Sequence, residues 1–400
     1  MEKVKIERLD DFGNGIGKIN GKIIFIPHTY INEVVLCDIK KETKNYLVGE
    51  MVELLEKSEK RIDSKCPYYG ICGGCSLQHL SYEDGINYKK EKIQNLLRRK
   101  KLYDKEILIV KNEQDYFYRN KIELKLENGK LGFYEQNTHK LVEIKECVIT
   151  KESINNVLKS ILKTGLKNAQ ITIRSNYNDE LLLIIDTQEQ FDYSKLIPGN
   201  KIAGIILNKK VIYNDSYFVE QVDDLYFRVS YDAFFQINEH IYKKLFSLLS
   251  SYIKKDSVVA DLYCGVGILS LIASKKAKKV YGIEIVENAI LDAIKNTAIN
   301  HINNAYFMVG SVPVLFPKIK DLVDTVIVDP PRFGLDKKTV SLLLDYKPNT
   351  IIYVSCNPST LVRDLENLTS DYEIKEITLF DMFSYTYHVE SVVLLEKKKR

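Results

Sequence analysis

From residue 232 to the end of the chain, short hydrophobic strand-like runs alternate with helical stretches. The strand-like runs cover residues 258–262, 279–285, 305–309, 325–329 and 350–355. Strands that alternate with helices form a parallel sheet covered on both faces, because each connection between parallel strands must cross the sheet. The alternation therefore predicts a doubly wound α/β domain at residues 231–400, with its ligand site at the carboxyl edge of the sheet.

The part of the chain before residue 231 has a different pattern, and 400 residues are too many for one ordinary core. Residues 1–59 contain five short strand-like runs with turns between them, which predicts a small β-barrel of the oligonucleotide-binding type. The segment Ile24-Phe25-Ile26-Pro27 and the glycines before it resemble the TRAM domain, an RNA-binding barrel; a purely structural barrel is the alternative. Residues 60–230 combine a cysteine-rich loop, a basic helix near 82–101 and several strands, so we expect a central α+β domain.

The composition is that of a globular chain, with 45% hydrophobic and 28% charged residues. No run reaches the roughly 18 uninterrupted apolar residues that a membrane span needs. The first residues lack the apolar core of a signal peptide. We therefore expect a monomer without membrane attachment in the reducing cytoplasm.

Positive charge is concentrated at residues 89–105, where eight Lys or Arg stand against two acids, while the whole chain carries only +4. A polyanion such as RNA would favour that surface, although a solvated helix face gives the same pattern. Both interpretations stay open from the sequence.

A glycine loop follows the first strand of the predicted sheet. Gly265 and Gly267 permit a tight turn and close approach of the backbone to a ligand. Position 270 is serine, so the three-glycine dinucleotide pattern fails and a ligand without a pyrophosphate is favoured. Glu284 closes the next strand, where a carboxylate can accept hydrogen bonds from both ribose hydroxyls. These features predict S-adenosylmethionine as cofactor; a packing turn with a surface glutamate is the alternative.

Three further segments lie at or near strand ends of the same sheet. Asp329 follows the fourth strand, Cys356 follows the fifth, and Glu390 opens a last strand at 391–396. A cysteine at the lip of a central strand, above a cofactor loop, is a candidate thiolate nucleophile. For Cys356 taken alone, an inert buried cysteine is the alternative.

Five motifs in this order resemble the RNA uracil-5-methyltransferase family, and the resemblance covers residue 1 to nearly 396. They are Phe235-Gln236-Ile237-Asn238, Asp261-Leu262-Tyr263-Cys264-Gly265-Val266-Gly267, Asp329-Pro330-Pro331-Arg332, Ser355-Cys356-Asn357-Pro358 and Asp381-Met382-Phe383 with His388-Val389-Glu390. The resemblance implies a Rossmann-like methyltransferase domain at the C-terminus. Ser384 departs from the family, whose members often have proline there; the change concerns a turn rather than a reacting group.

The chemistry of uracil explains the residue types in these motifs. C5 of uracil is too weak a nucleophile to attack a sulfonium methyl group directly, and addition of a thiolate to C6 makes it an enolate carbon that can. Cys356 would supply the thiolate. A base must then remove the C5 proton, and the resemblance assigns this step to Glu390. The resemblance also implies cofactor contacts for Gln236, Tyr263, Glu284 and Asp329. It further implies that Asp329 touches the uracil edge.

Cysteine spacing points to a second prosthetic group. Cys66, Cys72 and Cys75 fall within ten residues, and Cys147 lies far downstream. Four thiolates suit an iron–sulfur cluster or zinc. The resemblance to the cluster-bearing branch of the family favours a [4Fe–4S] cluster held by all four.

Three functions remain in competition at this point. An RNA uracil-5-methyltransferase is expected first, with 23S ribosomal RNA as substrate because barrel and cluster accompany that branch; transfer RNA is the alternative. A non-catalytic iron–sulfur RNA-binding protein would lack Cys356 or Glu390, and both are present. RNA cytosine-5 methylation would need another cysteine after the fourth strand, where Asp329 stands.

Overall fold

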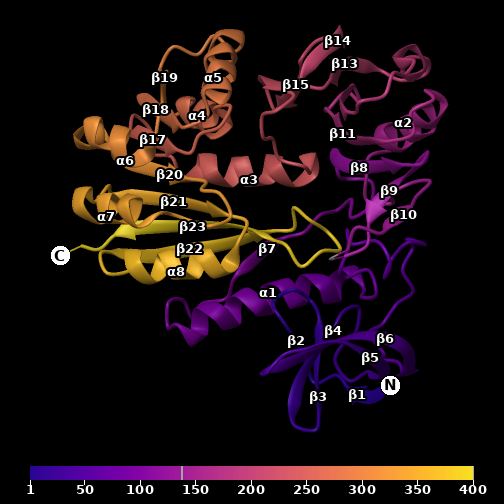
Figure 1. Ribbon diagram of the computed structural model, residues 1–400. Coiled ribbons are helices and arrows are strands. Elements are labelled where there is room, and N and C mark those ends of the chain that lie inside the picture. Colours follow the sequence, from indigo (N-terminus) through magenta and orange to yellow (C-terminus); the bar gives the residue numbers. More distant parts are fainter. Residues whose placement is uncertain (137, 400) are drawn as a thin grey trace.

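The computed structural model describes residues 1–136 and 138–399. An N-terminal barrel, a central α+β part and a C-terminal layered α/β part succeed one another along the chain (Figure 1). The predicted fold class is confirmed.

The N-terminal sheet has six strands in the order β1-β5-β6-β4-β3-β2. They are β1 (Glu2–Lys5), β2 (Arg8–Leu9), β3 (Gly15–Ile19), β4 (Lys22–Ile26), β5 (Val34–Glu42) and β6 (Tyr46–Glu56). The sheet curls until its two edges meet, and the backbone amide of Glu7 donates to the carbonyl of Ile16. A Cβ atom on Gly17 would lie 2.3 Å from Val4 Cγ1, so glycine is required where the edges approach.

The central sheet has seven strands in the order β10-β9-β8-β11-β12-β13-β14, all antiparallel except the β12–β13 pair. They are β8 (Lys121–Glu127), β9 (Lys130–Tyr134), β10 (Leu141–Glu143), β11 (Ala169–Ser175), β12 (Leu181–Asp186), β13 (Ile202–Leu207) and β14 (Lys210–Asn214). Helix α2 (Glu152–Lys163) and the short helix η1 (Tyr193–Leu196) bury apolar residues against this sheet. A two-stranded ribbon, β15 (Tyr217–Val222) with β16 (Leu225–Ser230), leads into the C-terminal part.

The C-terminal sheet has the order β19-β18-β17-β20-β21-β23-β22-β7. Its strands from this part of the chain are β17 (Val258–Leu262), β18 (Lys279–Glu284), β19 (Ala305–Val309), β20 (Thr325–Val328), β21 (Thr350–Ser355), β22 (Tyr372–Phe380) and β23 (Glu390–Lys397). The first five are parallel and match the predicted runs to within one residue. The strand order reverses between β17 and β20, which is where a doubly wound sheet binds its ligand.

Helices cover both faces of this sheet, as the alternation predicts. They are α3 (Glu239–Tyr252), α4 (Ile268–Ser274), α5 (Glu287–Ile299), α6 (Val312–Leu315), η2 (Phe316–Lys318), η3 (Lys320–Leu322), α7 (Lys337–Tyr346) and α8 (Pro358–Leu368). Successive residues of β17 point to opposite faces, so Val259 enters one core and Ala260 enters the other.

Helix α1 (Tyr82–Arg99) and strand β7 (Leu108–Val110) join the C-terminal sheet from an earlier part of the chain. β7 pairs in parallel with β22, and Ile93 and Leu97 of α1 enter a core of the C-terminal sheet. α1 therefore lies between the sheet and the barrel (Figure 1). The domain boundaries at 59/60 and 230/231 remain predictions. α1 and β7, which belong to the predicted central domain by sequence, pack on or pair with the C-terminal sheet. Among the described residues, no helix has the length and apolarity to cross a membrane.

Candidate active site

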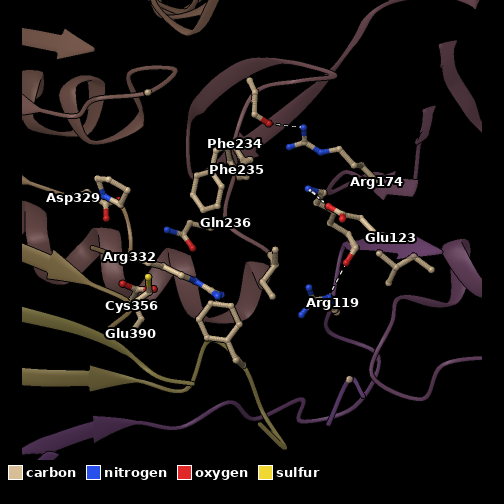
Figure 2. A pocket seen from close by; sticks show the side chains of 18 of the residues that line it. Arg119, Glu123, Arg174, Phe234, Phe235, Gln236, Asp329, Arg332, Cys356 and Glu390 are labelled. Carbon is tan, nitrogen blue, oxygen red and sulfur yellow. Dashed lines mark hydrogen bonds and ion pairs between the residues drawn. The ribbon is translucent and has the colours of Figure 1, made fainter. Parts of the chain in front are cut away.

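A cavity of about 1130 Å³ lies between the central and C-terminal parts, and residues from both line it. Figure 2 shows Asp329, Arg332, Cys356 and Glu390 together on one side and Arg119 and Arg174 on the other. Gln236 lies between the two sides. Seven of the eight residues that the sequence assigned to catalysis or to the cofactor border this cavity: Gln236 and six others. The six others are Tyr263, Gly265, Glu284, Asp329, Cys356 and Glu390.

The glycine loop lies directly after β17, as predicted. A Cβ atom on Gly265 would meet no atom within 4 Å, so this face of the loop is open. At Gly267 a Cβ would lie 2.8 Å from the Phe307 ring, so this glycine permits packing at the start of α4 and does not border the cavity. Glu284 Oε2 accepts a hydrogen bond from the Gly265 amide at 3.2 Å. Loop and carboxylate therefore form one unit at the carboxyl edge of the sheet.

Gln236 comes from the segment between β16 and α3. Its backbone carbonyl accepts a hydrogen bond from Asn120 Nδ2 at 3.2 Å, and Asn238 caps α3 two residues later through the His240 amide. These two anchors fix the segment, and the Gln236 amide points into the cavity (Figure 2).

Strand pairing brings the candidate catalytic residues together. Asp329 follows β20, Cys356 follows the adjacent β21, and Glu390 begins β23, which is antiparallel to β21. Because Ser355 pairs with Ser391, the residues one step beyond that pair on each strand, Cys356 and Glu390, lie side by side. Three reactive side chains thus reach one edge of the sheet from three neighbouring strands.

The electrostatics of this edge raise the pKa values of its three acidic groups. Burial, followed by the charges of Glu390 and Asp329, raises the pKa of Cys356 to about 11. Burial and then Asp329 raise the pKa of Glu390 well above its usual value, and burial raises the pKa of Asp329 to about 7. The positive charge of Arg332 opposes these shifts at both Cys356 and Glu390.

Several residues of the cavity were not identified from the sequence. Arg174 is buried, and its guanidinium donates to the Ala233 carbonyl at 2.7 Å, which supports the segment that carries Gln236. Arg119 lies on the same wall (Figure 2). Neither belongs to a motif. Arg332 does belong to one, directly after Asp329-Pro330-Pro331, and that place was the signal for its role in the site.

Two adjacent phenylalanines differ sharply in exposure. From its place in the first motif, Phe235 is expected to pack either on the substrate base or in the core. Phe235 is 4% exposed and packs edge-to-face on Tyr242, whereas Phe234 is 71% exposed and also borders the cavity. Phe235 is thus mainly a core residue, and the ring available to a ligand is Phe234.

Comparisons with known proteins agree with this site. A family described as tRNA (Uracil-5-)-methyltransferase matches residues 318–398, and the TRAM domain family matches residues 2–52. An uncharacterized RNA methyltransferase of Clostridium acetobutylicum is 33% identical and aligns over 97% of this chain and 96% of its own length. An uncharacterized RNA methyltransferase of Bacillus cereus is 34% identical and aligns over 99% of this chain and 96% of its own length.

Among solved structures, the tRNA (uracil-54, C5)-methyltransferase of Pyrococcus abyssi in complex with S-adenosyl-L-homocysteine has a TM-score of 0.84. It is 26% identical and covers 98% of this chain and 99% of its own. The chain belongs to the RNA (uracil-5-)-methyltransferase family. The predictions of an RNA methyltransferase and of RNA as partner are confirmed.

The four predicted cluster cysteines of this methyltransferase border the same cavity. Cys66, Cys72 and Cys75 come from the loop before α1, and each lies close enough to Cys147 for their charges to interact. Burial raises the pKa of Cys72 to about 11 and that of Cys75 to about 12. In residues 1–136 and 138–399, no three or more His, Cys, Asp or Glu side chains are arranged to hold a metal ion.

A buried ion pair anchors the segment of the methyltransferase that precedes Glu390. Lys89 of α1 donates to Asp381 Oδ1 at 2.5 Å and to the Phe383 carbonyl at 3.0 Å. Tyr82 and Ser384 donate to the other oxygen of Asp381 at 2.8 and 2.6 Å. The serine that departs from the family pattern is therefore part of this network. Lys89 is 2% exposed, so it cannot belong to an RNA-binding surface.

Proposed function

We propose that the chain transfers a methyl group from S-adenosylmethionine to C5 of uridine in RNA, with 23S ribosomal RNA as the substrate. The observation that carries the proposal is the convergence of Asp329, Cys356 and Glu390 beside the glycine loop in one cavity. A nucleophile, a base and a cofactor loop are the parts that this reaction needs.

The residues present fit S-adenosylmethionine. The open face of Gly265 leaves room for a ligand against the backbone, and Glu284 is held beside it to bind ribose hydroxyls. Gln236, Tyr263 and Asp329 would complete the contacts from other sides of the cavity, which they all border. When bound, the cofactor supplies an electrophilic methyl group.

The first steps belong to Cys356. Its thiol gives a proton to Asp329, whose pKa of about 7 leaves it partly ionised at neutral pH. Arg332 favours the thiolate that forms. The sulfur then bonds to C6 of the uracil, the C5–C6 double bond opens, and the electron pair passes through C5 and C4 to O4. C5 would then accept the methyl group that the bound cofactor supplies, and the electron pair of the broken carbon–sulfur bond would stay with the cofactor.

The last step belongs to Glu390. Its carboxylate removes the C5 proton, the C5–C6 double bond re-forms, and the Cys356 thiolate leaves. The charge of Asp329 is one cause of the raised pKa of Glu390. Once Asp329 has taken up the thiol proton, this repulsion is gone, which favours the ionised base when it is needed.

We also propose a [4Fe–4S] cluster bound by Cys66, Cys72, Cys75 and Cys147. Thiolate sulfur is the ligand that iron–sulfur clusters take from proteins. All four cysteines border one cavity, and the charge of Cys147 reaches each of the other three, which supports one group bound by all four. The bound cluster would supply a covalent tie between the loop and the strand region near Cys147.

Transfer RNA is the second candidate substrate, because the similar Pyrococcus abyssi enzyme acts on tRNA. The test is to map 5-methyluridine in ribosomal and transfer RNA from cells with and without the gene. Loss of the base from 23S ribosomal RNA alone supports the first candidate, and loss from tRNA alone supports the second. Unchanged 5-methyluridine in both would contradict the proposed function.

A further inference from the structure

The barrel touches the segment that carries the proposed base through a line of aromatic rings. Phe12, in the turn between β2 and β3, packs edge-to-face on Tyr387 with ring centroids 5.3 Å apart. The ring centroids of Tyr387 and His388 are 4.1 Å apart, and those of His388 and Phe383 are 5.7 Å apart. Phe383 borders the cavity. The rings therefore form a continuous path from the surface of the barrel to the wall of the active site.

The outer end of this path is left in solvent. Phe12 is 58% exposed, although a phenylalanine at a junction between two parts of a protein is normally covered. Tyr387 and His388 are partly exposed. The junction thus has aromatic rings, set edge-to-face or tilted to one another, that the protein itself does not fully cover.

Lys92 of α1 holds the two sides of this surface together. Its ammonium group donates to the Asp11 carbonyl at 3.1 Å on the barrel side and to the Tyr387 carbonyl at 2.8 Å on the other. Tyr88 adds a hydrogen bond from its hydroxyl to the Asp10 carbonyl at 2.8 Å. The rings are therefore held in place before any ligand binds.

Positive charge surrounds the inner end of the path. Burial of His388, followed by the charges of Arg332, Lys92, Lys89 and Arg119, lowers the pKa of that imidazole to about 4. His388 therefore stays neutral at physiological pH. A neutral aromatic surface with cations nearby suits a nucleotide, whose base stacks and whose phosphate is anionic.

We infer that Phe12, Tyr387 and His388 form a stacking platform for an unpaired RNA base next to the uridine in the cavity. A uridine must leave its stack to reach Cys356, and its neighbour loses a stacking partner when this happens. The platform offers that neighbour a replacement surface contiguous with the cavity wall. This inference rests on the proposed function, because it takes RNA as the molecule that enters the cavity.

A direct test uses the fact that the chain contains no tryptophan. Phe12→Trp introduces a single tryptophan into the platform, whose indole can be excited apart from the tyrosines, and single-stranded oligouridylate is the probe. We expect strong quenching on binding, because a stacked base quenches indole emission. Tyr306→Trp is the control, since Tyr306 is 48% exposed on β19, at the far edge of the C-terminal sheet from β7, and should not be quenched. Oligouridylate that binds both variants equally well without quenching the indole of Phe12→Trp would overturn the inference.

A kinetic test separates stacking from packing at the junction. With RNA from cells that lack the gene, Phe12→Ala and Phe12→Leu should both raise KM about tenfold, and Phe12→Trp should not. The value of kcat and the melting temperature should change little in all three. If the rings only seal the junction, Phe12→Leu would have the same KM as the unaltered protein, and this result would overturn the inference. Failure of the unaltered protein to methylate any RNA would instead count against the proposed function.

Discussion

The two sides of the cavity are built in different ways. On the catalytic side, each reactive group stands at the end of a strand in one sheet, and backbone pairing sets its place. On the cysteine side, Cys66, Cys72 and Cys75 lie in a loop without regular strands or helices, and Cys147 comes from a distant segment.

This difference has a physical consequence. A strand end is held by hydrogen bonds to its neighbours, so its side chain keeps its position when no ligand is present. A loop has few such bonds and depends on side-chain contacts or a bound group for its shape. We therefore expect changes on the catalytic side to affect chemistry alone, and changes on the cysteine side to affect structure and chemistry together.

The largest effect should come from the two catalytic residues, and it should be purely chemical. Cys356→Ala should abolish both methylation and covalent protein–RNA adducts, because no bond to C6 can form. Glu390→Gln should allow addition and methyl transfer but stall before elimination, leaving a methylated RNA adduct on denaturing gels. Both variants should melt like the unaltered protein.

The same comparison contains its own controls. RNA with 5-fluorouridine should form the adduct with the unaltered enzyme, since fluorine at C5 cannot leave as a proton. Normal turnover by Glu390→Gln without an adduct would remove the base assignment. An adduct formed by Cys356→Ala would remove the nucleophile assignment.

Cys147→Ser should have the next largest effect, and it should be structural. Anaerobically purified unaltered protein should be brown, with about four iron and four sulfide per chain. The variant should lose colour and iron and melt at a lower temperature. Cys37→Ser is the matched control, because Cys37 is buried in the barrel core away from the loop and should leave the iron content unchanged. Stoichiometric zinc without visible absorption would contradict the cluster.

Lys89→Met tests whether the catalytic side also depends on a contact from outside its sheet. The change leaves Asp381 buried without its cation, and loss of one partner of a buried pair costs about 3–5 kcal/mol. Urea unfolding monitored by circular dichroism should show it, and Asp381→Asn in the same chain should recover part of the loss. Lys90→Met is the control, since Lys90 pairs with the exposed Glu106. Equal midpoints for Lys89→Met and Lys90→Met would contradict the role of this pair.

A smaller effect is expected from Arg332, as a shift in the pH profile. Activity should rise with pH, because Asp329 must be ionised to accept the thiol proton and Glu390 must be ionised to remove the C5 proton, and the pKa of each carboxyl is raised. Arg332 lowers the pKa of Cys356 and Glu390, so Arg332→Gln should raise both and move the profile to higher pH. Arg332→Lys should keep the original profile. An unshifted profile in Arg332→Gln would show that this cation does not tune the site.

The smallest effect is expected far from both sides, at the exposed end of α1. Neutralising Arg98, Arg99, Lys100 and Lys101 should reduce the salt dependence of RNA affinity by about 0.7–0.9 per lost phosphate contact, measured as the slope of log K against log salt. Neutralising the exposed Lys209, in the turn after β13, and the exposed Lys210, the first residue of β14, is the control. An unchanged slope would mean that 98–101 is only a solvated face.

Local patterns in the sequence were enough for much of the fold and site. Five strands of the C-terminal sheet were predicted to within one residue, because buried parallel strands are continuous apolar runs. Asp329 and Cys356 could be placed together, because carboxyl ends of parallel strands share one edge. The barrel was predicted with five strands and has six, one of which, β2, is only two residues long.

Tertiary structure alone decided what depends on contacts between distant parts of the chain. The pairing of β7 with β22, the burial of Lys89 on Asp381, the position of Arg119 and the contact of Phe12 with Tyr387 join segments with no shared local pattern. Lys89 and Lys101 look alike in the sequence, yet one is buried and the other exposed. A residue's type and spacing fix its chemistry and its face on an element, but the partner of that face is fixed only when the elements pack.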